Sequence, residues 1–549
     1  MKTKLARKQN GIHYTPERFA KFLAQQIWQQ VRLNDQNTVR ILDPACGDGR
    51  LLKAMVDQNP NDICIHVTGV ETDADAASLA RRALEPLVET TIQHDDFLDS
   101  VCDIEDPEFD IIITNPPYVR IQNLGRKKTE QLRDRFGLNG RIDLYQAFTI
   151  AATRRLKPAG TLGLLTSNRF MYVQAGQTMR DYLLDQYQLK QIFDFGDTRL
   201  FEASVLPVVL IGNRRSKTTA VEESDCPMVR IYQTDEVDLD SETDNTVSSC
   251  IFEAVSRTDE QSFCRSEELT LKIETGTLKS NQGGLWSLSN SIAKRFQQRL
   301  KRRQVCTFGE IAEIKVGIKT TADAVFVQEH WDKLATEKMP EAELLKPLIT
   351  HHVCNRWKSA KPQRKVLYPY LQQPNREPIK LEDFPNANRY LLDHVDRLQS
   401  RKYLIDAGRK WYEIWVPQVT ADWQKSKIVW PDISEFPNFS FDESGAIVNG
   451  DCYWIKLKNG VDQDWLYLML AVANSQLAVE FYDTNFHNKL YSGRRRFMTQ
   501  YVKQFPLPDI KRDVCQEIIA VVKAKLDIPK IEPTTLDEVV NLLIEKAFD

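Results

Sequence analysis

The chain has 549 residues, of which 42% are hydrophobic and 27% charged, and its formal net charge is −3. These values exclude wholesale disorder, and the length predicts roughly two to four domains. No apolar run approaches the ~18–20 residues that a membrane helix needs, and no apolar segment follows the basic N-terminus, so we expect no membrane span and a cytoplasmic protein. The ten cysteines form no Cys-x-x-Cys pair, so we expect no metal site and no disulfide framework.

The net charge conceals an uneven distribution of acidic and basic residues. Residues 221–269 hold 14 acidic and 3 basic residues, a net of −11, which leaves the rest of the chain at +8. Basic residues cluster at 126–128, 299–303 and 494–496. Such clusters are usually solvated faces, but here they keep open a surface that contacts phosphates.

Strand-like and helix-like patterns alternate up to about residue 215. A helix is predicted from Thr15-Pro16, with Thr15 as N-cap and Pro16 in the first helical position, because an apolar residue then recurs every fourth position. Buried strands bounded by turn residues are predicted at 38–43, 63–71, 109–114, 161–166 and 191–195. This alternation favours an α/β fold with a mostly parallel sheet covered by helices on both faces.

The remainder of the chain has a different character. Residues 216–275 are acidic and rich in Ser and Thr, and we interpret them as a linker with a few edge strands. Aromatic residues become dense from about residue 276, which is typical of a packed core. We therefore expect a first domain over residues 1–215, the acidic linker, a second domain over 276–510 and a helical tail over 511–549.

A first candidate site lies where three predicted strands end. Residues 41–49 read as a strand that runs into a turn with Gly47 and Gly49, where the backbone can approach a ligand closely. Glu71 ends the next strand, 24 residues after Gly47, where a doubly wound fold places an acid for ribose hydroxyls. The third strand end carries Asp96-Phe97, an acceptor and a ring that suit adenine. Each residue alone is more simply a solvated acid or a core aromatic, but together they indicate an adenosine-containing cofactor.

A second candidate site is the turn Asn115-Pro116-Pro117-Tyr118 at the end of a buried strand. Two prolines fix the backbone and lack N–H groups, so the turn is stiff. The side-chain oxygen of Asn115 and the carbonyl of Pro116 offer two acceptors for the hydrogens of an exocyclic NH₂ group, which directs the nitrogen lone pair toward an electrophile. Tyr118 offers a face for stacking on a base. The alternative is a proline-stiffened strand exit with Asn115 as turn residue and Tyr118 as packing.

These motifs resemble those of S-adenosyl-L-methionine-dependent DNA methyltransferases, specifically the adenine-N6 enzymes with the gamma order of motifs in restriction–modification systems. The resemblance implies that Asn115, Pro116 and Tyr118 are the catalytic residues. It implies that a Tyr-Thr-Pro segment, here Tyr14, Thr15 and Pro16, holds the methionine part of the cofactor. Cofactor contacts are further implied for Asp43, Ala45, Gly47, Gly49, Glu71, Asp96, Phe97, Asn115 and Phe148. A late aromatic, Phe201, is implied to face Tyr118 across the target base.

The resemblance also implies the architecture and the partners. It implies a Rossmann-like methyltransferase domain with a mostly parallel seven-stranded sheet, followed by a mixed α+β DNA-recognition domain. The second domain resembles the family at residues 317–320, 346–348, 474–475 and 505–508. The implied substrate is a flipped-out adenine in double-stranded DNA. We expect a monomer without a nuclease domain ahead of the first motif, and a separate cognate restriction endonuclease remains open.

Four basic residues of the second domain, Lys319, Arg494, Arg495 and Arg496, are candidates for contacts with DNA, although a solvated basic surface explains them equally well.

Three other functions compete with adenine methylation. Cytosine-N4 methylation and methylation of a glutamine side chain in a protein pose the same chemical problem to an Asn-Pro-Pro-Tyr turn. A DNA-binding module with an inactive pocket is the non-enzymatic alternative, which the complete set of acidic residues and Asn115 disfavours.

Overall fold

The structure, a computed structural model, forms two compact units. The first comprises Met1–Lys294 with Phe486–Gly493, and the second comprises Arg295–Asn485 with Arg494–Asp549. The structure describes residues 15–31, 38–60, 63–100, 107–119, 124–138, 143–198, 206–216, 225–234, 251–255, 259–265, 270–280, 284–370, 377–486, 490, 493–527 and 533–549. Within these residues, no helix has the length and apolar character required to span a bilayer.

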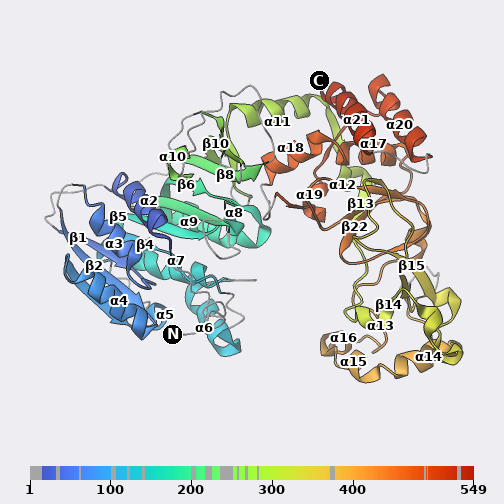
Figure 1. Ribbon diagram of the computed structural model, residues 1–549, viewed down its shortest axis with the longest axis horizontal. Helices are drawn as coiled ribbons and strands as arrows, with labels where there is room; N and C mark the ends of the chain where they lie inside the picture. Colours follow the sequence, from blue (N-terminus) through green and yellow to red (C-terminus); the bar gives the residue numbers. More distant parts are fainter. Residues whose placement is uncertain are drawn as a thin grey trace. The chain divides into compact units, whose positions relative to one another are not determined.

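The first unit is built on one large sheet (Figure 1). Its strands are β1 Thr38–Asp43, β2 Cys64–Glu71, β3 Glu89–His94, β4 Phe109–Thr114, β5 Leu156–Ser167, β6 Tyr187–Asp194, β7 Pro207–Arg214, β8 Pro227–Thr234, β9 Gln261–Arg265, β10 Thr270–Lys279 and β11 Ser287–Ser289. Seven of them follow the order β3-β2-β1-β4-β5-β7-β6, all parallel except β7, which is antiparallel to both of its neighbours. This arrangement confirms the expected seven-stranded methyltransferase fold.

The sheet is larger than expected, because β8 to β11 extend it beyond β6 to eleven strands in the described part of the chain. β8 pairs with β6 in parallel, and β10 pairs with β8 over the full register from Thr270 to Thr277. The segment interpreted as an acidic linker with a few edge strands contributes strands to the first unit, and the two compact units divide inside the helix α11 (Ser291–Arg303). β8 lies between β6 and β10 and is buried over residues 228–232, whereas β10 retains partly exposed positions.

Helices cover both faces of the sheet. They are α2 Glu17–Trp28, α3 Arg50–Asp57, α4 Ala74–Leu84, α5 Phe97–Ser100, α6 Arg126–Phe136, α7 Leu144–Arg155, α8 Arg169–Tyr172, α9 Gln177–Gln186 and α10 Ile251–Ala254. Side chains of α2, α3 and α4 pack on one face, where Ile111 and Ile113 of β4 lie, and side chains of α5 to α9 pack on the other, where Ile112 lies. This alternation is the two-residue period of a strand buried on both faces.

The second unit is a mixed α+β domain, as expected. Its strands are β12 Gln304–Thr307, β13 Ala312–Val316, β14 Val327–Gln328, β15 Leu345–Ile349, β16 Trp357–Lys358, β17 Lys365–Leu367, β18 Lys427–Pro431, β19 Ile433–Ser434, β20 Ser440–Asp442, β21 Ile447–Val448, β22 Cys452–Leu457, β23 Arg495–Arg496 and β24 Pro506–Pro508. They form a five-stranded sheet β13-β22-β18-β20-β16, a four-stranded sheet β14-β17-β15-β21 and two strand pairs. Trp357, Trp423, Trp430 and Trp454 are fully buried, so the aromatic density reflects a packed core.

The helices of the second unit are α12 Phe308–Ile311, α13 Asp323–Phe326, α14 Pro385–Leu392, α15 Val395–Gln399, α16 Lys402–Asp406, α17 Asp464–Ala473, α18 Gln476–Asn485, α19 Thr499–Val502, α20 Asp513–Leu526 and α21 Pro533–Phe548. The last two pack on α17 and α18, so the C-terminal segment is part of this unit. Asp537 of α21 accepts hydrogen bonds from the guanidinium of Arg356 and the indole of Trp357, each at 2.8 Å. Trp357 is buried with a positive φ of 75°.

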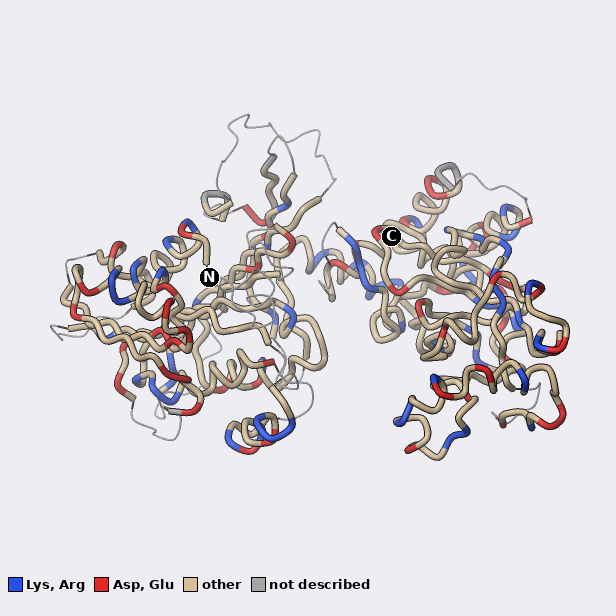
Figure 2. The backbone as a smooth tube through the Cα atoms, turned by 60° about the horizontal axis from the view of Figure 1, so that its bottom comes forward, with Lys and Arg blue, Asp and Glu red and all other residues tan. Residues whose placement is uncertain are grey.

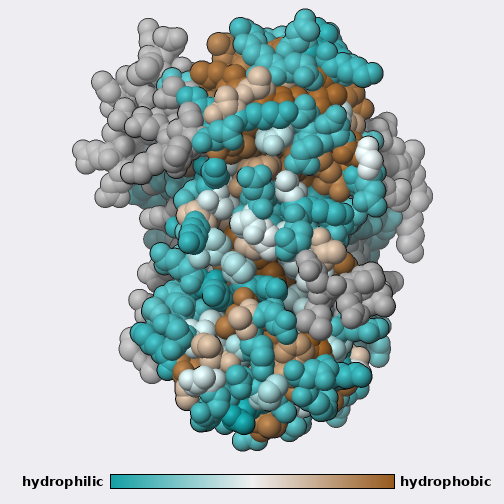
Figure 3. Space-filling view, turned by 90° about the vertical axis from the view of Figure 1, so that its right-hand side faces the viewer, coloured by the Kyte–Doolittle hydropathy of each residue, from teal (hydrophilic) through white to brown (hydrophobic). Residues whose placement is uncertain are grey.

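The outer surface of α21 is partly apolar, since Val539 and Leu542 are 42% and 55% exposed. Figure 3 shows brown, hydrophobic surface at the top of its view, the level at which α20 and α21 lie in Figure 1.

Asn474, which the family resemblance singled out, has a structural role. Its amide donates to the carbonyl of Phe439 and accepts from the Phe439 N–H, at 2.9 and 3.0 Å, as a neighbouring strand would.

Candidate active site

The candidate site residues lie at one edge of the sheet of the first unit. β3, β2, β1 and β4 are neighbouring parallel strands, so their carboxyl ends meet at the same edge. The glycine turn follows β1, Glu71 ends β2, Asp96 and Phe97 follow β3, and the Asn-Pro-Pro-Tyr turn follows β4. In open α/β sheets this edge is where ligands bind.

The turn after β1 is held in a shape that only glycine accommodates easily. Gly47 and Gly49 have positive φ angles of 55° and 82°. A Cβ atom on Gly49 would lie 3.1 Å from the Cα and Cβ atoms of Ala80 in α4, so the turn lies tightly against that helix. The backbone is therefore close-packed and fixed at the point where the resemblance places the cofactor.

Asp43 is a buried carboxyl at the start of this turn. Its side chain is 1% exposed, and Oδ1 accepts a hydrogen bond from the Ala45 N–H at 3.1 Å. Oδ2 is buried and has no hydrogen-bond partner of good geometry among the described residues, although the Thr114 hydroxyl lies close enough to lower the pKa of this carboxyl. Burial raises the pKa of Asp43 from its ordinary value to about 7, although the hydrogen bond from Ala45 lowers it. This orphaned oxygen is an acceptor available to a cationic or hydroxylated ligand.

Glu71 connects the glycine turn with the next strand. Its Oε2 accepts from the Gly47 N–H at 2.9 Å, and its Oε1 accepts from the Asp73 N–H at 2.8 Å. The predicted ribose-binding acid and the predicted glycine turn therefore lie in direct contact. The carboxylate is fixed by two backbone amides, which orients it at the sheet edge.

The predicted adenine-binding pair is also part of a contact network. Phe97 is 1% exposed and stacks on Phe148 of α7, with ring centroids 6.0 Å apart and an angle of 23° between the planes. Asp96 is 3.6 Å from the amine of Lys128 in α6, which is also paired with Asp99. The two aromatic residues implied to contact the cofactor thus lie against each other, and sequence reasoning missed Lys128, whose basic cluster was its only signal.

The most direct link between separate motifs joins Thr15 to Asn115. The structure starts α2 at Glu17, one residue later than predicted, and Thr15 makes no capping bond. Instead, the Thr15 hydroxyl accepts from the side-chain amide of Asn115 at 3.1 Å, and Thr15 is 5% exposed. Arg50, at the start of α3, donates to the Thr15 carbonyl at 3.3 Å and pairs with Asp48 at 2.9 Å. Sequence reasoning missed Arg50.

The structure also shows a contact within the Asn-Pro-Pro-Tyr turn that the sequence did not predict. The hydroxyl of Tyr118 donates a hydrogen bond to Oδ1 of Asn115 at 2.6 Å. The oxygen predicted as an acceptor is therefore already in contact with a donor in this structure, because a neighbouring hydroxyl lies within reach on the same tight turn. Burial raises the pKa of Tyr118, so the hydroxyl remains protonated and can donate.

The remaining predicted residues divide into three groups. Tyr14 and Phe201 lie outside the described residues. Lys319 and Arg494 are exposed, as a contact with DNA requires. Arg495 is 9% exposed and its guanidinium is held by both oxygens of Asp483 at 2.7 and 2.8 Å, a placement that argues against a phosphate contact.

The third arginine of this cluster and the basic helix α11 also have partners within the protein. Arg496 forms a two-pronged pair with Asp432, with distances of 2.7 to 3.0 Å. Lys and Arg concentrate along α11 (Figure 2), where Arg303 donates to the C-terminal Asp549 backbone oxygen at 3.0 Å. Exposed basic groups such as Arg494 thus remain the better candidates for phosphate contacts.

The residues present fit a nucleoside-containing methyl donor. Asp43 offers a buried oxygen without a partner, the turn after β1 lies close enough for backbone contacts, and Glu71 and Asp96 supply acceptors on successive strand ends. The rings of Phe97 and Phe148 provide an apolar wall. Acceptors for ribose hydroxyls and for an adenine amine are therefore arranged along one edge of the sheet.

Comparisons with known proteins agree with this arrangement. The chain matches the Eco57I restriction-modification methylase family over residues 65–201 and the TaqI-like C-terminal specificity domain over residues 376–507. It is 33% identical to the Type II methyltransferase M.BanIII of Aneurinibacillus aneurinilyticus, with 95% of this chain and 93% of that protein covered. It is 23% identical to M.BstVI of Geobacillus stearothermophilus, with 86% and 85% covered. The DrdV–DNA complex has a similar fold, with a TM-score of 0.53, 12% identity, and 96% of this chain and 58% of that chain covered.

Proposed function

Because the chain belongs to the Type II methyltransferases of restriction–modification systems, we propose that it methylates N6 of an adenine flipped out of double-stranded DNA. S-adenosyl-L-methionine is the methyl donor, and it supplies an electrophilic methyl group on a sulfonium. The observation that carries the proposal is the Asn-Pro-Pro-Tyr turn at the end of β4, held to Thr15 through Asn115 beside the glycine turn of β1.

The turn supplies the chemistry that an exocyclic amine needs. Oδ1 of Asn115 and the carbonyl of Pro116 accept the two N6 hydrogens, which favours a pyramidal nitrogen and aims its lone pair at the methyl carbon. As the N–C bond forms, the C–S bond breaks with its electrons on sulfur, and the nitrogen loses a proton to water. The amine becomes acidic as it gains positive charge, so no strong base is assigned. Positioning and electrostatics supply most of the rate enhancement.

The contact between Tyr118 and Asn115 adds a step to base capture. In the structure the Tyr118 hydroxyl uses Oδ1 of Asn115, the acceptor proposed for N6. When the Tyr118 ring turns to stack on the entering base, this acceptor is released to the amine. Base flipping costs a few kcal/mol of lost stacking, which the contact with Tyr118 helps to offset.

The second unit supports DNA as the substrate. It contains the match to a specificity domain, and it presents the exposed basic residues Lys319 and Arg494. One chain combines the transfer domain with the specificity domain, so we expect it to act as a monomer in the cytoplasm, where its DNA lies. A separate restriction endonuclease is the partner that such a system calls for.

The test is transfer of a labelled methyl group to duplex DNA, followed by hydrolysis and mass spectrometry of the nucleosides. We expect N6-methyladenine with the wild-type protein and none with Asn115→Ala, while Asn115→Ala retains cofactor binding. If the label appears in N4-methylcytosine, the substrate base is cytosine and not adenine. If the label appears in a glutamine of an added protein, the substrate is a protein and not DNA. Wild-type turnover by Asn115→Ala would overturn the role of the turn.

A further inference from the structure

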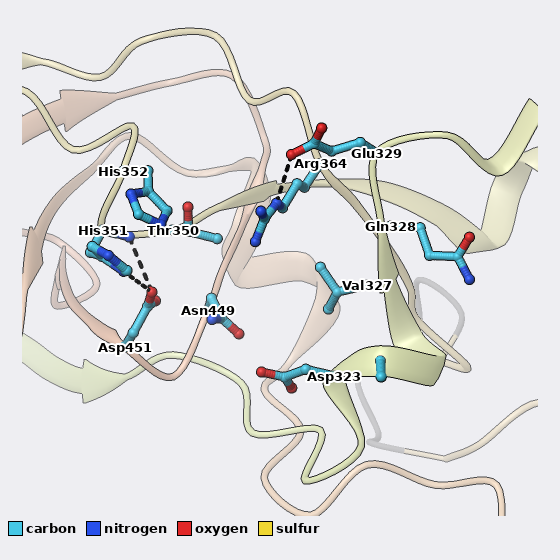
Figure 4. Close-up of a pocket in the computed structure, with 11 residues that line it drawn as sticks. Asp323, Val327, Gln328, Glu329, Thr350, His351, His352, Arg364, Asn449 and Asp451 are labelled. Atoms are coloured by element: carbon cyan, nitrogen blue, oxygen red, sulfur yellow. Dashed lines mark hydrogen bonds and ion pairs between the residues drawn. The ribbon is translucent and has the colours of Figure 1, made fainter.

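The second unit contains a polar pocket apart from the candidate active site. It has a volume of about 620 Å³, within the usual range of ligand sites, and it is formed by the loops around β14, β15 and β21 (Figure 4). Most of its lining residues are polar or charged in type, although apolar atoms contribute more of the lining surface, and those that the argument uses are Asp323, Glu329, His351, Arg364, Asn449 and Asp451.

The side chains of Arg364 and Asn449 have hydrogen-bonding groups that point into the pocket. Figure 4 shows the guanidinium of Arg364 and the amide of Asn449 pointing toward the middle of the pocket. Nε of Arg364 donates to Glu329 at 3.0 Å, which fixes the plane of the guanidinium and leaves its Nη groups on the pocket side. Asn449 is half-buried, and no hydrogen bond to its side-chain amide occurs among the described residues.

The backbone that carries these groups is held firmly. The Asn449 N–H donates to the Ile349 carbonyl at 2.8 Å, and the Asn449 carbonyl accepts from the Cys452 N–H at 3.0 Å. On the neighbouring wall, Oδ2 of Asp451 is 2.5 Å from Nδ1 of His351 and accepts from the His351 N–H at 3.2 Å. A preorganised site of this kind loses little freedom when it binds.

A strained loop forms a further wall. Thr321 has a positive φ of 57°, which is rare for a β-branched residue, and it lies two residues before Asp323 of the pocket. The buried guanidinium of Arg401 donates to the Thr320 carbonyl at 2.9 Å and holds the loop in place. Strained conformations that the surrounding structure maintains cluster at binding and catalytic sites.

The mixed charges of the pocket indicate whether it suits a DNA phosphate or the edge of a base. A phosphate would approach Arg364 and His351, but it would also meet the carboxylates of Asp323, Glu329 and Asp451. A base edge presents both donors and acceptors, which the combination of guanidinium, amide and carboxylates complements. The mixture of charges therefore favours a base edge over a phosphate.

We propose that this pocket reads one base pair of the DNA target, with the Nη groups of Arg364 donating to N7 and O6 of a guanine. The side-chain amide of Asn449 forms hydrogen bonds with the edge of a neighbouring base. Glu329 is a positioning residue that orients the guanidinium plane of Arg364. The inference rests on the proposed action on DNA, and it names residues that determine sequence specificity.

The experiment selects sequences by binding, without methyl transfer. The full-length protein is incubated with a library of random duplex DNA, the bound duplexes are recovered through several rounds, and they are sequenced. We expect the wild-type protein to enrich a motif with a guanine that Arg364→Ala ceases to prefer, with a loss of discrimination of about tenfold to hundredfold at that position alone. Arg389→Ala is the matched control, since Arg389 is also exposed and donates to one carbonyl, that of Glu337.

Each outcome bears on the assignment. An unchanged motif with Arg364→Ala, or no enriched motif with the wild-type protein, would overturn the assignment of the pocket. An enriched motif that depends on Arg364, in a protein that transfers no methyl group to that motif, would support the pocket and overturn the proposed reaction. A second variant, Asn449→Ala, should relax the preference at the same or the adjacent position.

Discussion

The hydroxyl of Thr15 and the side-chain amide of Asn115 form a hydrogen bond across 100 positions of the sequence. This bond fixes the orientation of the Asn115 amide, because its nitrogen is used by Thr15 and its oxygen is turned toward Tyr118. Under the proposed reaction, Thr15 thereby sets the direction in which the catalytic acceptor points.

Replacing Thr15 by Val should therefore impair transfer more than binding. The substitution keeps the shape of the side chain but removes a buried hydrogen bond worth about 1–2 kcal/mol, so kcat should fall about tenfold while KM for the cofactor changes little. Thr15→Ser should restore most of the activity. Steady-state kinetics of the three proteins measures this, and equal kcat values for Val and wild type would contradict the positioning role.

Two substitutions of Tyr118 separate its ring from its hydroxyl. Tyr118→Phe keeps the stacking face and removes the donor that uses Oδ1 of Asn115, so KM for DNA should be equal to or lower than that of the wild type. Tyr118→Ala loses stacking worth about 1–3 kcal/mol, which should raise KM for DNA by about fivefold to a hundredfold. If kinetics show that Phe is as damaging as Ala, the hydroxyl itself takes part in transfer.

Asp43 should make the stability of the first unit depend on pH. Burial raises its pKa in the folded protein to about 7, whereas an unfolded Asp titrates near about 4, so the folded state binds the extra proton between these values. The free energy of unfolding should therefore fall as pH rises from about 4 to 7, by an amount on the order of a few kcal/mol.

Asp43→Asn retains an acceptor for the Ala45 N–H and cannot ionise. We expect this variant to be more stable than the wild type at pH 8 and to show a flatter pH dependence in denaturant titrations. It should also bind the cofactor more weakly if the orphaned oxygen serves the ligand. Parallel pH profiles of the two proteins would exclude Asp43 as the titrating group.

Arg494 and Arg495 are sequence neighbours with different expected roles. Arg494 is exposed, so Arg494→Ala should lower DNA affinity and reduce the salt slope of binding by about 1. Arg495→Ala should instead remove a mostly buried ion pair with Asp483 and destabilise the second unit by roughly 3 kcal/mol. Binding titrations at several salt concentrations and thermal unfolding distinguish the two, and a salt slope unchanged by Arg494→Ala would remove it from the DNA contacts.

The sequence predicted the part of the fold in which local pattern and burial agree. β1 and β4 begin and end at the predicted residues, since each is a short apolar run with turn residues at its boundaries. The same pattern identified Gly47, Glu71 and Asn115 at the strand ends, because parallel strands bring these ends to one edge. The strands β8, β9 and β10 lie in a segment whose acidic, Ser- and Thr-rich composition obscures them, and pairing with β6 and with one another places them in the sheet.

Contacts between distant side chains could not be predicted in the same way. The bond from Asn115 to Thr15 depends on how α2 packs on the sheet, where Gly163 of β5 lets Ile27 approach so closely that a Cβ atom would lie 2.2 Å away. The pocket of the second unit combines loops that lie far apart in the sequence, such as those of His351 and Asp451, which are 100 residues apart. No short motif marks either feature.

The carboxylate of Asp537 has a consequence for the end of the chain. This single group satisfies both Arg356 and the indole of Trp357, whose backbone adopts a conformation that side chains rarely tolerate. A truncation that removes α21 would leave the Trp357 indole buried without its acceptor, and it would take one of three acceptors from the Arg356 guanidinium, which keeps the carbonyls of Pro437 and Asn474. The C-terminal helix α21, 16 residues long, thus stabilises the second unit, although the sequence alone suggests only a short helical tail.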